Sequence, residues 1–79
     1  MRSQDVVQSQ VRKILSDVLE RPIGSEEVRR ENEPNWDSLR HVELLFCIEE
    51  TFSVRLSEDE FSAANSLQEL VRIVMTHEK

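Results

Sequence analysis

The apolar residues near the start of the chain recur every three or four positions, and this spacing constrains the fold more than any other feature. Residues at such intervals share one side of an α-helix. We therefore predict a helix over residues 4–20 that ends near Pro22, because the residue before a proline avoids the helical region. The apolar stripe consists of Val7, Val11, Ile14, Leu15 and Val18, widened by Val6 and Leu19.

A second helix is predicted over residues 38–51 by the same spacing. Val42 and Phe46 form a narrower apolar pair, displaced from the main face and bordered by acidic residues, which makes them a candidate contact site. Periodicity alone equally allows Phe46 to be core in a wide stripe. The main face, predicted to be core, holds Leu44, Leu45, Ile48 and Phe52.

Two further helices are predicted to begin with a capping box, in which the side chains of a Ser and of the Glu three residues later each accept a hydrogen bond from the other's backbone amide. The box at Ser57 predicts a short helix, and the box at Ser66 predicts a last helix that frays over residues 77–79. The last helix has an apolar face of Leu67, Leu70, Val71 and Val74, bordered by Ile73.

The whole chain of 79 residues is long enough for one small domain, residues 1–79. Gly occurs once and Tyr never, and β-branched residues do not alternate with polar ones, which argues against a sheet. We therefore predict an all-α fold, a small four-helix bundle of three main helices and one short helix. Between the first two helices, residues 21–36 form a long loop, with Ile23 and Val28 as apolar pins and a short helical turn within residues 25–28.

The net charge of −6 disfavours nucleic acid as a partner and suits docking to basic protein surfaces. Cys47 is the single cysteine, so an internal disulfide is excluded, and we interpret it as an inert core thiol. Neither a membrane-spanning run nor a signal peptide is evident in the sequence. We expect a cytoplasmic monomer that does not insert into membranes.

Ser38 is the strongest candidate for chemistry, because it follows Asp37 where a polar loop becomes an apolar helix. Backbone amides and the helix dipole at such a site favour a phosphate ester. The plain alternative is a helix cap, with Asp37 doing the capping. A hydrolase built on Ser38 and His41 is a weaker reading, since His41 is expected to be an ordinary exposed residue. Trp36 is expected to pack against the helix start and fix the approach of the loop.

The segment around Ser38 resembles the acyl carrier proteins, a family marked by Asp-Ser-Leu at the start of the second helix of a four-helix bundle. Here the motif is Asp37-Ser38-Leu39. The resemblance extends from the first helix to about Val74. It includes Val42, Glu43, Leu44, Glu49, Glu50, Phe52, Leu56, residues 58–60, Ser66 and Leu67.

The resemblance implies that Ser38 carries a 4′-phosphopantetheine arm that holds acyl groups as thioesters, with Asp37 and Leu39 completing the motif. A phosphopantetheinyl transferase would load the arm from coenzyme A with a divalent metal. Acyl-activating, acyl-transferring or condensing enzymes would be the other partners. The protein would then be a carrier and not an enzyme. The alternative is a helical protein-interaction module with no prosthetic group.

Three departures from the fatty-acid type of carrier are Trp36, Arg40 and His41, and the Gly-Gly-His-Ser run of many peptidyl carriers is absent. We interpret the chain as a stand-alone carrier of a fatty-acid, polyketide or specialised lipid or polymer pathway, and favour a specialised one. In the family the second helix is the recognition helix. We expect partners to contact Val42, Glu43, Phe46 and Glu49, with Arg40 narrowing the choice of partner.

Overall fold

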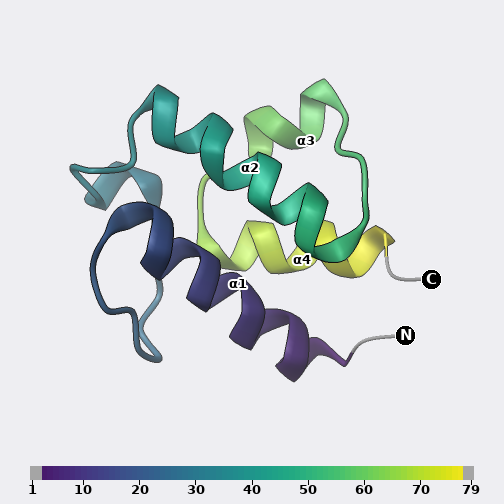
Figure 1. The fold of residues 1–79 in the computed structure, drawn as a ribbon, viewed down its shortest axis with the longest axis horizontal. Coiled ribbons are helices and arrows are strands. Elements are labelled where there is room, and N and C mark those ends of the chain that lie inside the picture. Colours follow the sequence, from purple (N-terminus) through teal and green to yellow (C-terminus); the bar gives the residue numbers. More distant parts are fainter. Residues whose placement is uncertain (1–2, 78–79) are drawn as a thin grey trace.

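The structure, a computed structural model, describes residues 3–77 and is all-helical in that range (Figure 1). The predicted bundle of three long helices and one short helix is confirmed. A 3₁₀-helix, η1, lies in the long loop. The elements in chain order are α1 (Gln4–Leu19), η1 (Arg30–Asn32), α2 (Ser38–Phe52), α3 (Glu58–Ala63) and α4 (Leu67–His77).

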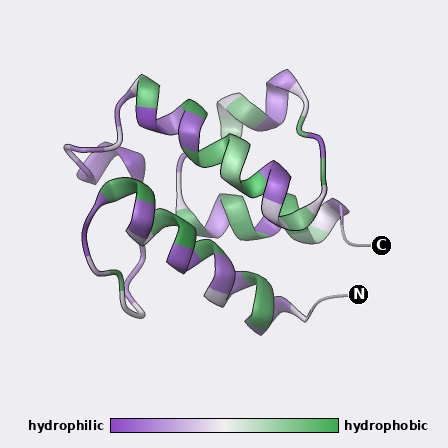
Figure 2. Cartoon of the chain, viewed as in Figure 1, coloured by the Kyte–Doolittle hydropathy of each residue, from purple (hydrophilic) through white to green (hydrophobic). Residues whose placement is uncertain are grey.

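The three long helices pack around one apolar core. Figure 1 shows α1 running antiparallel to α2 and α4, and α1 packs against both. Hydrophobic and hydrophilic residues alternate along all three helices (Figure 2), as expected of helices that are each buried on one side. The predicted core faces of α1, α2 and α4 are confirmed, although Val6 is exposed and Ile14 only partly buried. The fully buried core includes Val7, Val11, Leu15, Leu19, Leu44, Leu45, Ile48, Leu67, Leu70 and Val74.

Local backbone conformation and side-chain hydrogen bonds set the ends of the helices. α1 stops at Leu19, one residue earlier than predicted, because Glu20 adopts the left-handed region with φ 56°. The capping box at Ser57 is complete, as predicted. The predicted box at Ser66 forms only in part: the Ser66 hydroxyl accepts from the Glu69 amide at 3.1 Å, but the Glu69 carboxylate binds Arg72. Of the residues predicted to fray, His77 still belongs to α4, and the last two lie outside the described residues.

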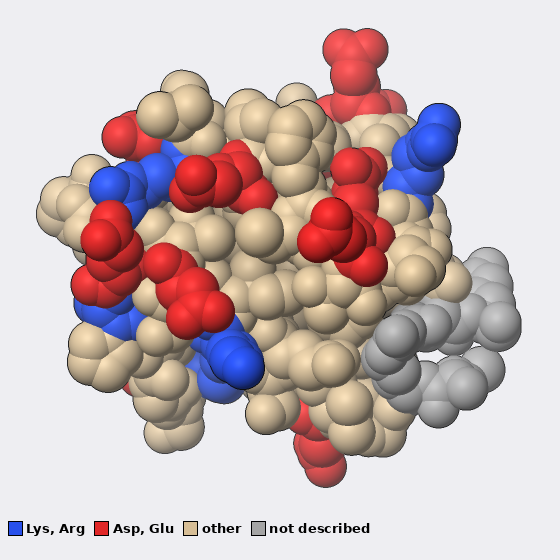
Figure 3. All heavy atoms as spheres, viewed as in Figure 1, with Lys and Arg blue, Asp and Glu red and all other residues tan. Residues whose placement is uncertain are grey.

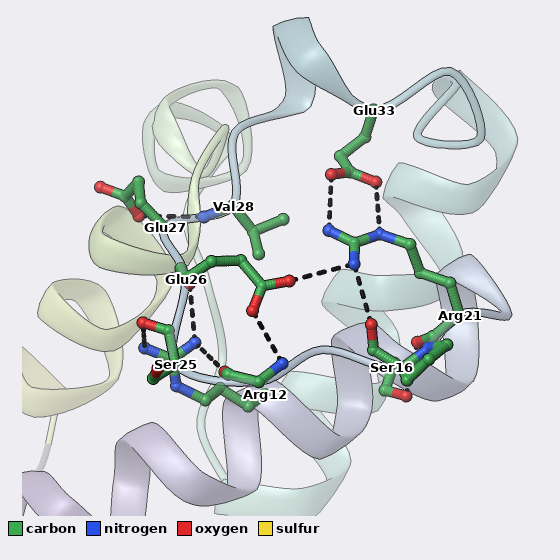
Figure 4. Close-up of polar contacts among 10 residues, drawn as sticks. Arg12, Ser16, Arg21, Ser25, Glu26, Glu27, Val28 and Glu33 are labelled. Atoms are coloured by element: carbon green, nitrogen blue, oxygen red, sulfur yellow. Dashed lines mark hydrogen bonds and ion pairs between the residues drawn. The ribbon is translucent and has the colours of Figure 1, made fainter.

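Arg12 binds the long loop to α1, and Arg21 joins two parts of the loop to each other (Figure 4). Arg12 donates to the carbonyls of Gly24 and Glu26 at 2.6 and 2.8 Å. Arg21 grips both carboxylate oxygens of Glu33 at 2.9 and 2.8 Å and reaches Glu26 at 3.1 Å. Glu33, and then Glu26, raise the pKa of Arg21, so its charge is permanent here. Hydrogen bonds from two arginine side chains, in place of regular backbone hydrogen bonds, therefore fix this part of the loop.

The far half of the loop is pinned to the start of α4. Val28 is buried and its carbonyl accepts from the Leu67 amide at 2.8 Å, while the Arg30 amide donates to Asn65 at 2.8 Å. The predicted apolar pins are confirmed, since Ile23 also packs against the core. The helical turn predicted within residues 25–28 is wrong. Its carbonyls are used by Arg12, and the turn forms at Arg30–Asn32 instead.

Phe52→Ala tests the core assignment of α2. Phe52 is 3% exposed, so removing its ring should lower the free energy of unfolding by roughly 3–5 kcal/mol, as a cavity and lost burial predict. Urea unfolding followed by circular dichroism measures it. Leu39→Ala on the same helix is the control, because Leu39 is 78% exposed and should change stability by about 0.5 kcal/mol or less. Equal losses in the two variants would contradict the assignment.

Candidate functional site

Ser38 is the first residue of α2, and its side chain is exposed. The preceding Asp37 caps the helix: its carboxylate accepts from the Arg40 amide at 2.9 Å. Among residues 3–77 no group forms a hydrogen bond with the Ser38 hydroxyl. The capping task therefore falls to Asp37, and the Ser38 hydroxyl is accessible from solvent.

Trp36 and His41 form a buried polar contact at the entry to α2. The Trp36 indole is 3% exposed, and its Nε1–H donates to His41 Nδ1 at 3.0 Å. This confirms the expected packing of Trp36. His41 was expected to be exposed, and that expectation is wrong: it is 8% exposed, because Trp36 covers it on one side and α3 on the other.

His41 cannot serve Ser38 as a base in this arrangement. Its Nδ1 is occupied by Trp36, and its Nε2 lies 2.8 Å from the carbonyl oxygen of Phe61. Within the described chain no hydrogen bond joins His41 to Ser38. A nucleophilic serine needs its base within hydrogen-bonding reach, so the hydrolase reading loses its geometric basis.

An exposed apolar stripe runs along α2 from the residue after Ser38. Leu39, Val42 and Phe46 are 78, 41 and 59% exposed, and their spacing puts them on one side of the helix. Phe46 meets the half-buried Phe61 of α3 edge-on, with ring centroids 6.4 Å apart. The alternative that placed Phe46 in the core is therefore wrong. We call Leu39, Val42 and Phe46 the α2 stripe.

Of the two carboxylates predicted to flank this stripe, only Glu43 is fully exposed. Glu49 is half-buried, and its carboxylate accepts from the Leu56 amide at 2.9 Å. Glu49 thus holds the segment between α2 and α3 and is less open to the partner contact expected of it than Glu43 is. Figure 3 shows acidic groups scattered over the face that carries α2, with most Lys and Arg toward the side of the long loop.

Arg40 points its charge at α1. Its guanidinium donates to the Val18 carbonyl at 2.8 Å and pairs with Glu20 at 3.0 Å. Val18 lies in the last turn of α1, where carbonyls have no partner within the helix, and a cation there also suits the helix dipole. Arg40 therefore joins the end of α1 to the start of α2.

Cys47 is exposed, so its interpretation as a core thiol is wrong. Partial burial, followed by the charges of Glu43, Glu50 and Asp17, raises the pKa of the thiol. It stays protonated at neutral pH, which makes it a poor nucleophile. Within residues 3–77 no cluster of His, Cys, Asp and Glu is arranged to hold a metal ion.

Comparison with known proteins supplies the family. The chain is 32% identical over 76 residues to a curated protein named acyl carrier protein 3, from Ralstonia nicotianae (strain ATCC BAA-1114 / GMI1000). The match covers 91% of this chain and 85% of that protein. The chain belongs to the acyl carrier protein family. No family model matches it.

Family membership makes a carrier role the general expectation and implies a phosphopantetheine prosthetic group in general. It also suggests enzyme partners, without naming them. Among the described residues of this acyl carrier protein, no helix has the length and apolar character to cross a membrane.

The sequence analysis missed the hydrogen bond between Trp36 and His41, although a signal was present. Trp36 precedes the Asp37 cap, and His41 is the fourth residue of α2. Apolar residues at these two positions often pack together and fix how the chain enters a helix. A Trp paired with a His at this spacing adds a hydrogen bond to that packing.

Asp37 can be tested as a cap apart from its charge. Asp37→Ala should lower the free energy of unfolding by about 1 kcal/mol, because the Arg40 amide loses its acceptor. Asp37→Asn keeps an acceptor oxygen and should stay within a few tenths of a kcal/mol of the parent, roughly. Thermal unfolding of the three proteins decides it. If Asn is as damaging as Ala, the negative charge and not the hydrogen bond stabilises α2.

Proposed function

We propose that Ser38 bears the 4′-phosphopantetheine arm and that the protein carries acyl groups on it as thioesters. The observation that supports this most is the Ser38 hydroxyl, exposed at the first position of α2 while Asp37 does the capping. A module without a prosthetic group would need Ser38 only as a helix cap, and Asp37 already caps α2. The carrier acts as a tethering partner of enzymes and is not itself a catalyst.

The start of α2 fits a phosphate ester. Asp37 satisfies the amide of Arg40, and within residues 3–77 the amides of Ser38 and Leu39 have no partner. Free amides at a helix start, together with the helix dipole, favour a negative group on the Ser38 oxygen. When bound, the arm supplies the thiol that forms the thioester. The chain supplies the anchoring oxygen and a fixed point from which a flexible arm can reach partner enzymes.

The α2 stripe is our proposed docking surface for the phosphopantetheinyl transferase and for acyl-activating, acyl-transferring or condensing enzymes. It presents apolar side chains beside Ser38, with the Glu43 carboxylate exposed among them. Exposed apolar groups flanked by charge are typical of contact sites that bind reversibly. Glu49 and Arg40 contribute less than expected, since both already bind other parts of the chain.

The pathway that this carrier serves is proposed to be a specialised lipid, polyketide or polymer pathway. The support is the start of α2, where Arg40 and His41 stand after the motif and Arg40 uses its charge on α1. Enzymes that recognise a uniformly acidic helix would find a different charge pattern here.

Ser38→Ala should abolish loading while leaving the fold intact. Incubation with coenzyme A, a divalent metal and a broad-specificity phosphopantetheinyl transferase should add the mass of one phosphopantetheinyl group to the parent. The Ala variant should gain none. Ser62→Ala, which removes an exposed hydroxyl from α3, is the matched control and should load like the parent. An unmodified parent, or a modified Ser38→Ala variant, would overturn the assignment.

Charge reversal on the α2 stripe should slow loading by lowering the association rate. Glu43→Lys should reduce kcat/KM of the transferase roughly three- to tenfold at low salt, and the difference should shrink as salt rises. Asp5→Lys in the first turn of α1, away from the start of α2, changes the net charge equally and serves as control. Equal rates for these two variants would show that this transferase does not read α2.

A further inference from the structure

The contact of Trp36 with His41 continues into α3. His41 Nδ1 accepts from Trp36 Nε1–H at 3.0 Å, and His41 Nε2 lies 2.8 Å from the Phe61 carbonyl oxygen. One imidazole thus connects the segment before Ser38, the first turn of α2 and the last turn of α3. We call this set of two hydrogen bonds the His41 bridge.

The partners of His41 fix its protonation state. An indole nitrogen can only donate, and a carbonyl oxygen can only accept. His41 must therefore be neutral, with its proton on Nε2 and a lone pair on Nδ1. A second proton would place an N–H on Nδ1, facing the N–H of Trp36, and the Trp36 hydrogen bond would be lost.

The bridge matters most for α3. Phe61 lies in the last turn of this six-residue helix, so its carbonyl has no helical partner and depends on His41. No residue of α3 is fully buried. Its other attachments are the Ser57 cap, the edge contacts of Phe61, and the hydrogen bond between Glu60 and His77 Nε2 at 2.9 Å.

The charged groups around the bridge offer no substitute for it. On the loop, Arg30 donates to the Trp36 carbonyl at 3.3 Å; on α2, Asp37 is held by the Arg40 amide. On α3 and α4, Glu60 and His77 bind each other. Within residues 3–77 no carboxylate forms an ion pair with His41 that would compensate a positive imidazole.

We propose that Trp36 and His41 are positioning residues for the loading of Ser38, and that protonation of His41 breaks the Trp36 half of the bridge. Trp36 precedes the Asp37 cap directly, so its fixed indole sets the path of the chain into Ser38. Phe61 stands edge-on to Phe46 of the α2 stripe, so the same bridge holds α3 beside the proposed docking surface. The loading role rests on the proposed function; the existence of the bridge does not.

The first experiment tests the bridge in the full, unloaded chain. Trp36 is the only tryptophan and His41 one of two histidines, so tryptophan emission between pH 8 and pH 5 reports on this pair. We expect acidification to change the emission of the parent and of the His77→Gln control, and to leave that of His41→Gln unchanged. Two-bond ¹H–¹⁵N correlation should show His41 protonated on Nε2 alone at pH 8. A proton on Nδ1 at pH 8 would overturn the bridge, and a flat emission curve in the parent would overturn its release by protonation.

The second experiment tests positioning by comparing kcat/KM for transferase loading across the same pH range. Dividing the kcat/KM of the parent by that of the variant at each pH removes the pH dependence of the transferase itself. His41→Asn keeps an acceptor for Trp36, and His41→Gln keeps a donor for Phe61, so each retains half of the bridge. This ratio of kcat/KM values should be roughly three- to tenfold at pH 8, which corresponds to the net free energy of one hydrogen bond. It should fall toward one as the pH is lowered.

Trp36→Phe provides a second test in case a His41 variant fails to fold. It keeps an aromatic ring in the core and removes the indole N–H that donates to His41. It should show the same decline of the ratio toward low pH. A ratio that stays constant with pH for all three variants would overturn the positioning role, even where emission confirms the bridge. A parent that takes no arm at any pH would overturn the proposed function and the loading role together, while the ¹H–¹⁵N correlation at pH 8 would still decide whether the bridge exists.

Discussion

The burial of the α1 stripe between α2 and α4 is the interaction on which the rest of the structure depends. A chain of 79 residues has little apolar surface to bury, so each long helix must present one continuous face to the others. Val7, Val11 and Leu15 are fully buried in this way. α2 and α4 both run antiparallel to α1, so the connection from α1 to α2 joins neighbouring ends, whereas the connection from α2 to α4 returns across the bundle through α3 (Figure 1).

The first of these connections is long, and polar side chains give it a fixed shape. Arg12 and Arg21 bind its carbonyls and carboxylates, while Val28 anchors it to the core (Figure 4). The connection ends at Trp36, whose buried indole meets the first turn of α2. A loop held at so many points delivers Ser38 to a defined place, as the proposed attachment of an arm shared among several enzymes requires.

The polar residues after Ser38 link helices. Arg40 binds the last turn of α1, His41 binds α3, and Glu49 binds the segment that leads to α3. The proposed docking surface, which consists of Leu39, Val42 and Phe46 with Glu43, is consequently more apolar than the sequence suggests. Recognition of this carrier would depend on fewer charges and on a longer apolar contact.

The sequence by itself determined the helices, the core faces and the position of Ser38, because these depend on local spacing, on capping residues and on a motif of three adjacent residues. Val42 and Phe46 were already displaced from the core face by periodicity, although only the packed structure excluded burial of Phe46. The tertiary structure alone decided the roles of Arg40, His41 and Glu49. Each is polar and sits on a predicted helix, where spacing gives the direction of a side chain but not what lies opposite. Their partners are Val18, Phe61 and Leu56, which come close only after the helices have packed.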